Sequence, residues 1–146
     1  YIRKPSISPA LLYLKENLRI LVVDDVSWNT QVFVNYLERL KEKTLIAING
    51  LDAVKVYQES HLRGENIDVI IMDYDMPIMN GKEALIKIRK YEKIHSLKPS
   101  VIIIVSGHVD QRIINECLNA GEEERADYFL RKPVTFEQIR QVLSKV

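Results

Sequence analysis

The stretch DVIIMD at residues 68–73 joins an apolar run of strand length to a carboxylate. The same pattern recurs outward from it, in ILVVDD at 20–25, VIIIVS at 101–106 and YFLRK at 128–132. Continuous apolar runs rich in Val and Ile are typical of strands buried on both faces, as in a parallel sheet covered by helices. Polar residues that can carry chemistry follow these runs: Asp24, Asp25, Asp73, Ser106 and Lys132.

Apolar runs of strand length alternate with helical periodicity from Arg19 to the end of the chain. We predict strands at residues 19–23, 44–48, 68–72, 100–105 and 127–130. Between them, apolar residues recur at helical spacing, as in Phe33, Tyr36, Leu37 and Leu40. Five strands and five helices in strict alternation predict an α/β fold, a doubly wound five-stranded parallel sheet flanked by helices. Ligands of such sheets bind beyond the carboxyl ends of the strands, so we expect the five polar residues to share one rim.

Composition and charge exclude several classes of protein. A length of 146 residues with 47% hydrophobic content supports one core and one domain. The 21 basic and 20 acidic residues nearly cancel, without the basic face typical of nucleic-acid binding. No apolar stretch approaches the ~20 residues that cross a bilayer, and no signal peptide opens the chain. We expect a cytoplasmic domain that contacts neither nucleic acid nor membrane. This expectation is compatible with a parent protein that is attached to a membrane through another segment.

Residues 1–18 precede the alternating pattern and are predicted to form a linker or N-terminal extension. Ser8 and Pro9 favour a short helix over residues 10–17, with the serine as its N-cap. The folded domain is predicted to span residues 19–146. Because residue 1 is Tyr rather than Met, the sequence reads as a segment of something longer. The histidines are expected at the surface without partners: His61, His95 and His108.

Three carboxylates at one rim require a counter-charge, because like charges at short range raise pKa values unless a cation is present. Mg²⁺ is the expected ion, since it accepts carboxylate oxygens and completes its coordination with water and phosphate oxygens. Zinc would need His or Cys ligands at suitable spacing. With Mg²⁺ and the ammonium of Lys132 offsetting charge, a carboxylate can attack a phosphoryl group. Asp73 is the predicted nucleophile, because it lies between the acidic pair and the Ser106 and Lys132 side of the sheet, and the product is an aspartyl phosphate.

Each of these residues also has a simpler explanation when taken alone. An Asp after a strand often caps a helix or closes a turn. Ser106 with Gly107 alone is a turn, and Lys132 before Pro133 alone is an exposed lysine ahead of a helix. Their joint placement at successive strand ends favours a functional site over these separate explanations.

At these residues the chain resembles the receiver domains of two-component and phosphorelay response regulators. The resemblance covers about residues 19–146 and implies a flavodoxin-like fold with strand order 2-1-3-4-5. It also implies a phosphoprotein that takes its phosphoryl group from a phosphohistidine of a histidine kinase or histidine phosphotransfer protein. Such a domain catalyses its own phosphorylation and dephosphorylation but is mainly a signalling module. The motifs that carry the resemblance are VVDD at 22–25 with Asn29, MDYDMPIMNG at 72–81, VSG at 105–107 and LRKP at 130–133.

The resemblance assigns roles to the acidic residues and the lysine. Asp73 accepts the phosphoryl group. Mg²⁺ is held by Asp25, Asp73 and the backbone carbonyl of Asp75, with Asp24 ligating directly or through water. Lys132 pairs first with Asp73 and then with a phosphoryl oxygen.

A conformational switch is implied in the same way. Ser106 moves inward to bond a phosphoryl oxygen, and the aromatic residue three before the lysine, Phe129, follows it. This motion reshapes the face of the fourth helix, fifth strand and fifth helix for a downstream protein. Gly107 stands where the family usually has Ala and is expected to loosen the loop that carries Ser106, while Trp28 is expected in the docking surface for the phosphodonor.

Two alternative functions remain open from the sequence. A pseudo-receiver would keep the fold as an interaction module and fail to take up BeF₃⁻ with Mg²⁺. A haloacid-dehalogenase-like phosphatase is suggested by Asp73-x-Asp75, although that motif normally follows the first strand, where this chain has Asp24-Asp25. A dinucleotide-binding site is excluded, because residues 24–28 (DDVSW) contain no glycine. The non-Met start favours the receiver of a hybrid sensor histidine kinase over a stand-alone regulator.

Overall fold

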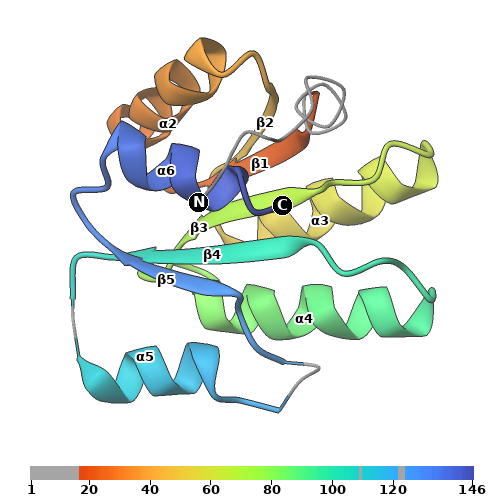
Figure 1. Ribbon diagram of the computed structural model, residues 1–146. Helices are drawn as coiled ribbons and strands as arrows, with labels where there is room; N and C mark the ends of the chain where they lie inside the picture. Colours follow the sequence, from red (N-terminus) through yellow and green to blue (C-terminus); the bar gives the residue numbers. More distant parts are fainter. Residues whose placement is uncertain (1–16, 109, 122–123) are drawn as a thin grey trace, which may run out of the picture.

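The computed structural model describes residues 17–146 apart from 109, 122 and 123, and within this part five strands and five helices alternate (Figure 1). The strands are β1 (Arg19–Val23), β2 (Lys43–Ala47), β3 (Val69–Asp73), β4 (Val101–Ser106) and β5 (Tyr128–Arg131). The helices are α2 (Ser27–Arg39), α3 (Gly50–Leu62), α4 (Gly81–Ile94), α5 (Gln111–Leu118) and α6 (Phe136–Leu143). Apart from Asn17, the expected helix over residues 10–17 lies outside the described residues.

The strands form one parallel sheet in the order β2-β1-β3-β4-β5, which confirms the predicted fold class and strand order. The central pair is β1 and β3, with Ile20 opposite Val69 and Val23 opposite Met72. The strand order reverses between these two strands, and ligands of such sheets bind at that point. Because all strands are parallel, the residues that close them gather at one edge of the sheet.

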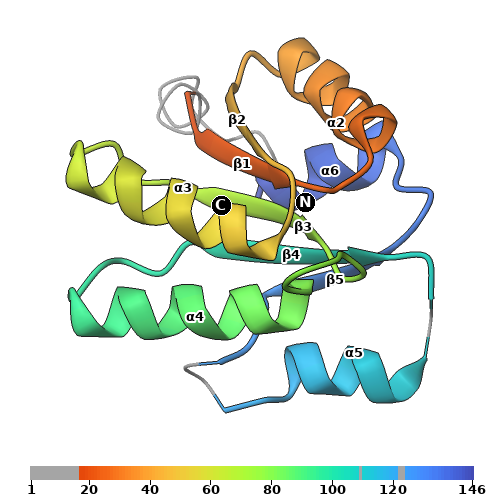
Figure 2. The same ribbon diagram turned by 180° about the vertical axis from the view of Figure 1, so that it is seen from behind.

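Two hydrophobic clusters lie on opposite faces of the sheet. Helices α2 and α6 cover one face, and α3, α4 and α5 cover the other (Figures 1 and 2). Successive strand residues point to opposite faces, so Ile20 enters one cluster and Leu21 the other, both fully buried. Each such side chain stabilises the fold by about 1.5–3 kcal/mol. None of the helices in the described part of the chain has the length and apolarity needed to cross a bilayer.

Side-chain caps fix where the helices near the sheet edge begin. Asn80 accepts a hydrogen bond from the backbone N–H of Glu83, whose carboxylate accepts one from the backbone N–H of Asn80. Thr135 and Gln138 form the same reciprocal pair at α6. Each cap contributes about 1 kcal/mol. The α4 cap also fixes where the loop that starts after β3 ends.

Four strands are displaced by one residue from the prediction. β2 starts one residue earlier, whereas β3, β4 and β5 start and end one residue later. Asp73 and Ser106 are therefore the last residues of β3 and β4 rather than the first after them. The reason is that the backbone ladder continues whatever the polarity of the side chain, so Asp73 still pairs with Val105 and Ser106 with Arg131.

The surface also differs from the prediction at two places. Ile46 in β2 is 50% exposed because β2 is an edge strand, so burial on both faces is wrong for it. His61 and His95 have partners, contrary to expectation. Nδ1 of His61 lies 2.7 Å from the hydroxyl of Tyr91, and the ring of His95 stacks on Tyr91 with centroids 4.0 Å apart. The sequence pattern missed this cluster because its members come from α3 and from the end of α4.

Candidate phosphoryl-transfer site

The carboxyl ends of β1 and β3 bring three aspartates together. Asp24 and Asp25 follow β1, and Asp73 ends the neighbouring strand β3. Carboxylate oxygens from the three residues lie within 4.8 Å of one another. Asp24 and Asp73 are buried, at 2% and 6% exposure, whereas Asp25 is exposed. Among the residues that the structure describes, this is the one group of three or more His, Cys, Asp or Glu side chains with such spacing.

Lys132 reaches this acidic cluster from the end of β5. Its Nζ lies 3.1 Å from Oδ1 of Asp73 and 3.2 Å from Oδ2 of Asp24. Its backbone N–H donates to the carbonyl of Ser106, which fixes the end of β5 beside the end of β4. The fold thus places Lys132 against two of the three clustered aspartates, Asp24 and Asp73.

Asp24 has a local and a long-range role. Its Oδ1 accepts a hydrogen bond from the backbone N–H of Val26 at 2.9 Å, which is the turn contact that a purely structural explanation requires. Its Oδ2 accepts one from Lys132. Val26, the N-cap of α2, makes no side-chain capping bond. The two contacts of Asp24 therefore shape the turn that leads into α2 and hold the carboxylate of Asp24 next to Lys132.

Burial and neighbouring charges shift the pKa values of the paired groups. Burial raises the pKa of Asp73 to about 6; the hydrogen bond from Lys132 lowers it in part, and the charge of Asp24 raises it further. Burial lowers the pKa of Lys132, but its hydrogen bonds and its attraction to Asp73 and Asp24 outweigh this, so the net pKa is raised. Lys132 therefore offsets the cost of ionising the buried Asp73 only in part, and a further cation near this carboxylate would stabilise its ionised form.

The donor set fits a magnesium ion. The three clustered side chains offer hard carboxylate oxygens and no nitrogen or sulfur. Three carboxylates and one ammonium leave a formal charge of −2, which a divalent cation balances. The exposed side of the cluster, at Asp25, leaves room for water or phosphate oxygens, and Mg²⁺ usually retains several such ligands.

Asp75 and His108 lie beside this cluster rather than in it. The carboxylate of Asp75 is 62% exposed and lies 3.9 Å from Nδ1 of His108. The backbone N–H of His108 donates to Oγ of Ser106 at 3.1 Å. The expectation that His108 has no partner is therefore wrong. Its position two residues after Ser106 was the signal in the sequence that could have placed it at the rim.

Comparison with known proteins identifies the family. Residues 20–144 match the model of the response regulator receiver domain. The chain belongs to this family. Its relatives and structural neighbours are the receiver domains of two-component and phosphorelay systems, in response regulators and in hybrid histidine kinases.

Two relatives show the range of proteins that carry this domain. The chain is 27% identical over 132 residues to the peroxide stress-activated histidine kinase mak1 of Schizosaccharomyces pombe, covering 90% of this chain and 8% of mak1. It is 30% identical over 139 residues to two-component response regulator 24 of Arabidopsis thaliana, covering 90% of this chain and 86% of that protein. The receiver domain thus spans a small part of the kinase and most of the regulator.

Two solved structures have the same fold. The receiver domain of the sensor histidine kinase PA1611 from Pseudomonas aeruginosa, with a magnesium ion coordinated in its active-site cleft, superposes with a TM-score of 0.71 at 25% identity, covering 88% of this chain and 96% of that one. The receiver domain of Ssk1 from Saccharomyces cerevisiae, in complex with the histidine phosphotransfer protein Ypd1, superposes with a TM-score of 0.75 at 22% identity, covering 89% of this chain and 88% of that one.

The two expected switch residues of this receiver domain lie on adjacent strands. Ser106 ends β4 and is fully buried, with its hydroxyl oxygen accepting from His108. Phe129, in β5, lies opposite Ile104 of β4. It is partly buried and packs against the hydrophobic cluster under α3, α4 and α5.

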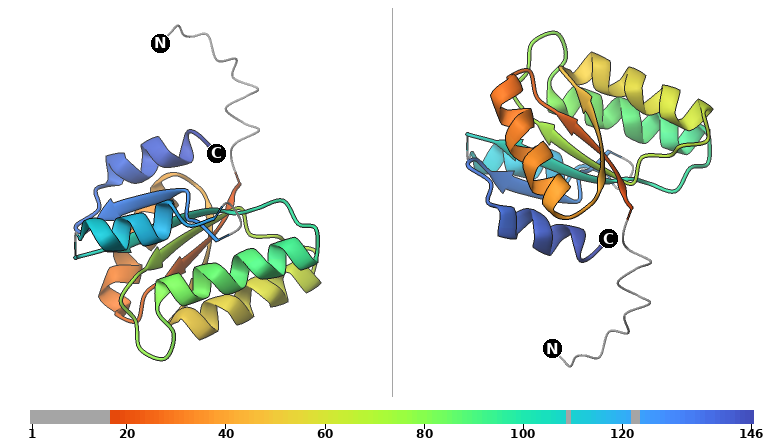
Figure 3. Two further views of the ribbon diagram at one scale, coloured as in Figure 1. Left: turned by 90° about the horizontal axis from the view of Figure 1, so that it is seen from below. Right: turned by 90° about the horizontal axis from the view of Figure 1, so that it is seen from above.

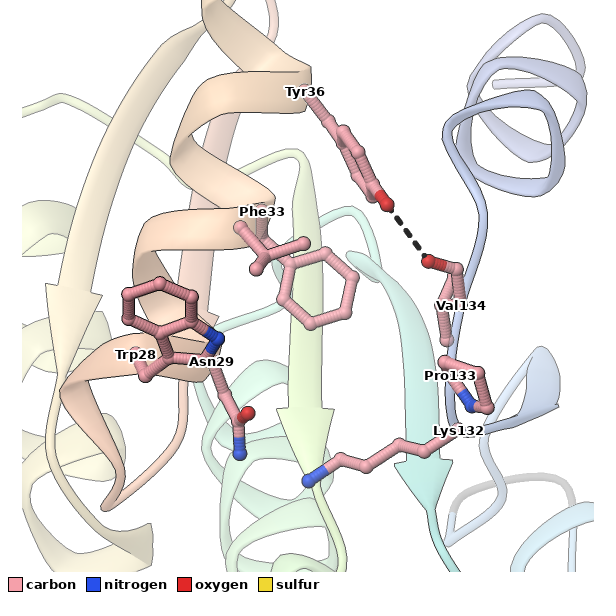
Figure 4. A pocket seen from close by; sticks show the side chains of 8 residues that line it. Trp28, Asn29, Phe33, Tyr36, Lys132, Pro133 and Val134 are labelled. Carbon is pink, nitrogen blue, oxygen red and sulfur yellow. Dashed lines mark hydrogen bonds between the residues drawn. The ribbon is translucent and has the colours of Figure 1, made fainter.

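An apolar groove of about 360 Å³ lies beside Lys132, between α2 and the segment that joins β5 to α6 (Figure 4). Trp28, which is 77% exposed, and Phe33 line it from α2, and Pro133 and Val134 line it from the other side. The hydroxyl of Tyr36 donates to the carbonyl of Val134 at 3.0 Å and closes one end. The groove thus joins an exposed apolar surface directly to the ammonium that contacts Asp73.

Proposed function

We propose that this receiver domain accepts a phosphoryl group on Asp73 from the phosphohistidine of a histidine kinase or histidine phosphotransfer protein. The observation that carries the proposal is the position of Lys132, whose Nζ contacts the buried carboxylates of both Asp73 and Asp24. A carboxylate is a weak nucleophile, and phosphoryl transfer depends mostly on positioning and charge neutralisation. The site supplies both for Asp73.

The chemistry follows from the charges. An oxygen of Asp73 attacks phosphorus, the bond from phosphorus to the donor nitrogen breaks, and the electron pair stays with the imidazole, leaving an aspartyl phosphate. Lys132 moves its contact from the carboxylate to an oxygen of the transferred group. Asp25, Asp73 and the backbone carbonyl of Asp75 would hold Mg²⁺, with Asp24 ligating directly or through water. The bound ion supplies positive charge to the phosphoryl oxygens and to the acidic cluster.

The phosphorylated state acts through Ser106 and Phe129. Ser106 turns its hydroxyl from His108 toward a phosphoryl oxygen, and Phe129 moves into the space this opens. The surface of α5, β5 and α6, which is the fourth-helix, fifth-strand and fifth-helix face of the family, then changes shape for a downstream protein. Because a ligand shifts an equilibrium only by its differential affinity, the new hydrogen bond to Ser106 provides the bias.

The groove beside Trp28 is the docking surface for the phosphodonor. It lies next to Lys132, so a protein bound there would present its histidine to Asp73. The complex of Ssk1 with Ypd1 supports a histidine phosphotransfer protein as one such partner. We assign residues 19–146 to the receiver and residues 1–18 to a linker. The match to mak1 supports a hybrid histidine kinase as the parent protein.

Incubation with acetyl phosphate and Mg²⁺ tests the proposal, with intact mass as the readout. The parent chain should gain one phosphate, and Asp73→Asn should gain none. Equal gain by the mutant would exclude Asp73 as the nucleophile. Failure of the parent to gain phosphate or to bind BeF₃⁻ with Mg²⁺ would favour a pseudo-receiver. Replacing Trp28 by Ala should slow transfer from a phosphorylated histidine phosphotransfer protein far more than transfer from acetyl phosphate.

A further inference from the structure

A second apolar groove runs between α3 and α4, which lie side by side on the sheet face away from α2 and α6 (Figures 2 and 3). It has a volume of about 450 Å³. Leu51 and Ile94 are 53% and 77% exposed within it, an unusual placement for large aliphatic side chains in one continuous depression. Exposed apolar patches on soluble domains typically mark interaction sites. The apolar residues that line it are Leu51, Val54, Met79, Tyr91 and Ile94.

This groove is separate from the surfaces assigned above. Its walls come from α3, α4 and the loop residue Met79, and none of them belongs to α2, α5, β5 or α6. The phosphodonor groove at Trp28 lies on the opposite face of the sheet. The proposed function therefore leaves the α3–α4 groove without a role.

The charged residues that line the groove are of one sign. The charged residues that line it are both lysines, Lys87 and Lys90, and both are exposed. Carboxylates on an occupant would face these ammonium groups, and complementary charge steers association and suppresses wrong partners. The occupant that fits is therefore apolar on one side and acidic at its margins.

The shape of the groove favours a helix. From Leu51 to Gln58 on α3 and from Lys87 to Ile94 on α4, the lining residues extend over seven positions, or roughly 10 Å at 1.5 Å per residue. A furrow between two helices of that length accepts a third helix of two to three turns, whose apolar residues recur at i, i+3 or i+4, and i+7. We propose that the α3–α4 groove binds an acidic amphipathic helix of a partner protein.

Charge argues against two other occupants. Residues 1–16 of this chain carry Arg3, Lys4 and Lys15 against one acidic residue, Glu16, so that segment would bring positive charge to a lysine-lined groove. A second copy docked groove to groove would set Lys87 and Lys90 against the same lysines, because an isologous interface pairs a surface with itself. A partner helix rich in Asp and Glu avoids both conflicts.

The test uses a synthetic helical peptide of about three turns, with leucines at i, i+3 and i+7 on one face and glutamates elsewhere, fluorescently labelled. The control peptide keeps the leucines and replaces each glutamate by lysine. Binding to the full chain is measured by anisotropy and mapped by amide chemical shifts. We expect saturable binding that shifts α3 and α4 amides, weakens with salt, and falls about tenfold in Ile94→Ser and in the double variant Lys87→Glu, Lys90→Glu.

Trp28→Ser is the matched control, because Trp28 is as exposed as Ile94, at 77%, but lies on the other face. It should leave peptide affinity unchanged, and circular dichroism verifies that all variants are folded. Equal binding of the lysine peptide, or equal loss in Trp28→Ser, would overturn the proposal. Evidence for another occupant would also overturn it. Groove amides that shift on deletion of residues 1–16 would indicate the N-terminal segment, and a dimer lost in Ile94→Ser would indicate a second copy. Co-sedimentation with phosphatidylserine vesicles that needs Lys87 and Lys90, while the acidic peptide fails to bind, would indicate a membrane surface.

Discussion

The ammonium of Lys132 lies 3.1 Å from a carboxylate oxygen of Asp73 while also contacting Asp24, so one cation contacts two buried carboxylates at the ends of two adjacent strands. The side chains of Asp24 and Asp73 are 2% and 7% exposed, and that of Lys132 is 26% exposed. Positive charge is therefore in place before any phosphoryl group arrives. Preorganised charge of this kind costs no rearrangement during reaction and is usually a large part of catalysis.

Replacing Lys132 by Met should slow phosphorylation by acetyl phosphate about a hundredfold, because the variant keeps the alkyl chain but loses the cation that would contact a phosphoryl oxygen. The measurement is the initial rate of mass gain at saturating Mg²⁺. Lys145→Met, near the C-terminus, is the charge-matched control and should keep the parental rate. A parental rate in Lys132→Met would remove this residue from the mechanism.

Asp73 should destabilise the metal-free fold at neutral pH. Its pKa is about 6 in the folded chain, whereas the ordinary value is 3.8. The folded state therefore binds the proton of this carboxyl more tightly than the unfolded state does. Stability from this group is fully present below pH 4 and is lost as the pH rises through 6. Asp73→Asn should therefore raise the free energy of unfolding at pH 7.5 by about 1–3 kcal/mol, using 1.36 kcal/mol per pKa unit as the upper bound.

Urea unfolding of both proteins without Mg²⁺, at pH 4 and pH 7.5, measures this difference. The gain in unfolding free energy of Asp73→Asn should vanish near pH 4, where the carboxyl of Asp73 is protonated in both the folded and the unfolded parent. At pH 7.5, saturating Mg²⁺ should stabilise the parent more than the variant and narrow the gap. A gain that does not change with pH would show that ionisation of Asp73 is not its cause.

Protonation should also limit phosphorylation. In the proposed reaction only the ionised carboxylate of Asp73 attacks phosphorus, so at limiting Mg²⁺ the rate with acetyl phosphate should fall as the pH drops through about 6. A cation in the acidic cluster favours the ionised form, so saturating Mg²⁺ should move the midpoint to lower pH. Rates measured from pH 5 to 8 at two Mg²⁺ concentrations test this, and a midpoint insensitive to Mg²⁺ would contradict it.

The sheet and its rim were predictable because each depends on a local signal. The apolar run before Asp73 is buried on both faces, at 0–1% exposure from Val69 to Met72, and the carboxyl ends of parallel strands must meet at one edge. The exact ends of the strands were less accessible. Polarity suggested a stop before Asp73 and Ser106, whereas backbone pairing carries both strands through them.

The contacts between elements were beyond the sequence pattern. Arg89 and Glu92 lie three positions apart on α4, a spacing common among exposed charged pairs, yet their side chains are only 7% and 3% exposed. Their burial depends on partners far along the chain: Arg89 also binds the carbonyl of Ser100 and the carboxylate of Asp127, and Glu92 accepts from the hydroxyl of Tyr57. No local signal encodes a network assembled from α3, α4 and the starts of β4 and β5.

This buried network predicts a large loss of stability for Arg89→Met. The variant leaves the carboxylate of Glu92 buried without its cation, and breaking a buried pair in this way costs about 3–5 kcal/mol. Urea unfolding measures it. Arg140→Met removes an exposed pair with Glu137 and should leave the midpoint nearly unchanged, since exposed pairs contribute little. Similar losses in the two variants would mean that burial of the Arg89 pair has no energetic consequence.

Replacing each of two glycines near the site by Ala should have opposite effects on stability. A Cβ on Gly81 would lie 2.4 Å from the backbone oxygen of Asp73, so Gly81→Ala must shift α4 or Asp73, destabilising by about 1–3 kcal/mol and slowing phosphorylation. A Cβ on Gly107 meets nothing within 4 Å, so Gly107→Ala should be neutral or stabilise by about 0.4–1 kcal/mol through the unfolded chain. Thermal unfolding and acetyl phosphate kinetics of both variants decide the matter. Parental behaviour of Gly81→Ala would mean that Asp73 tolerates displacement.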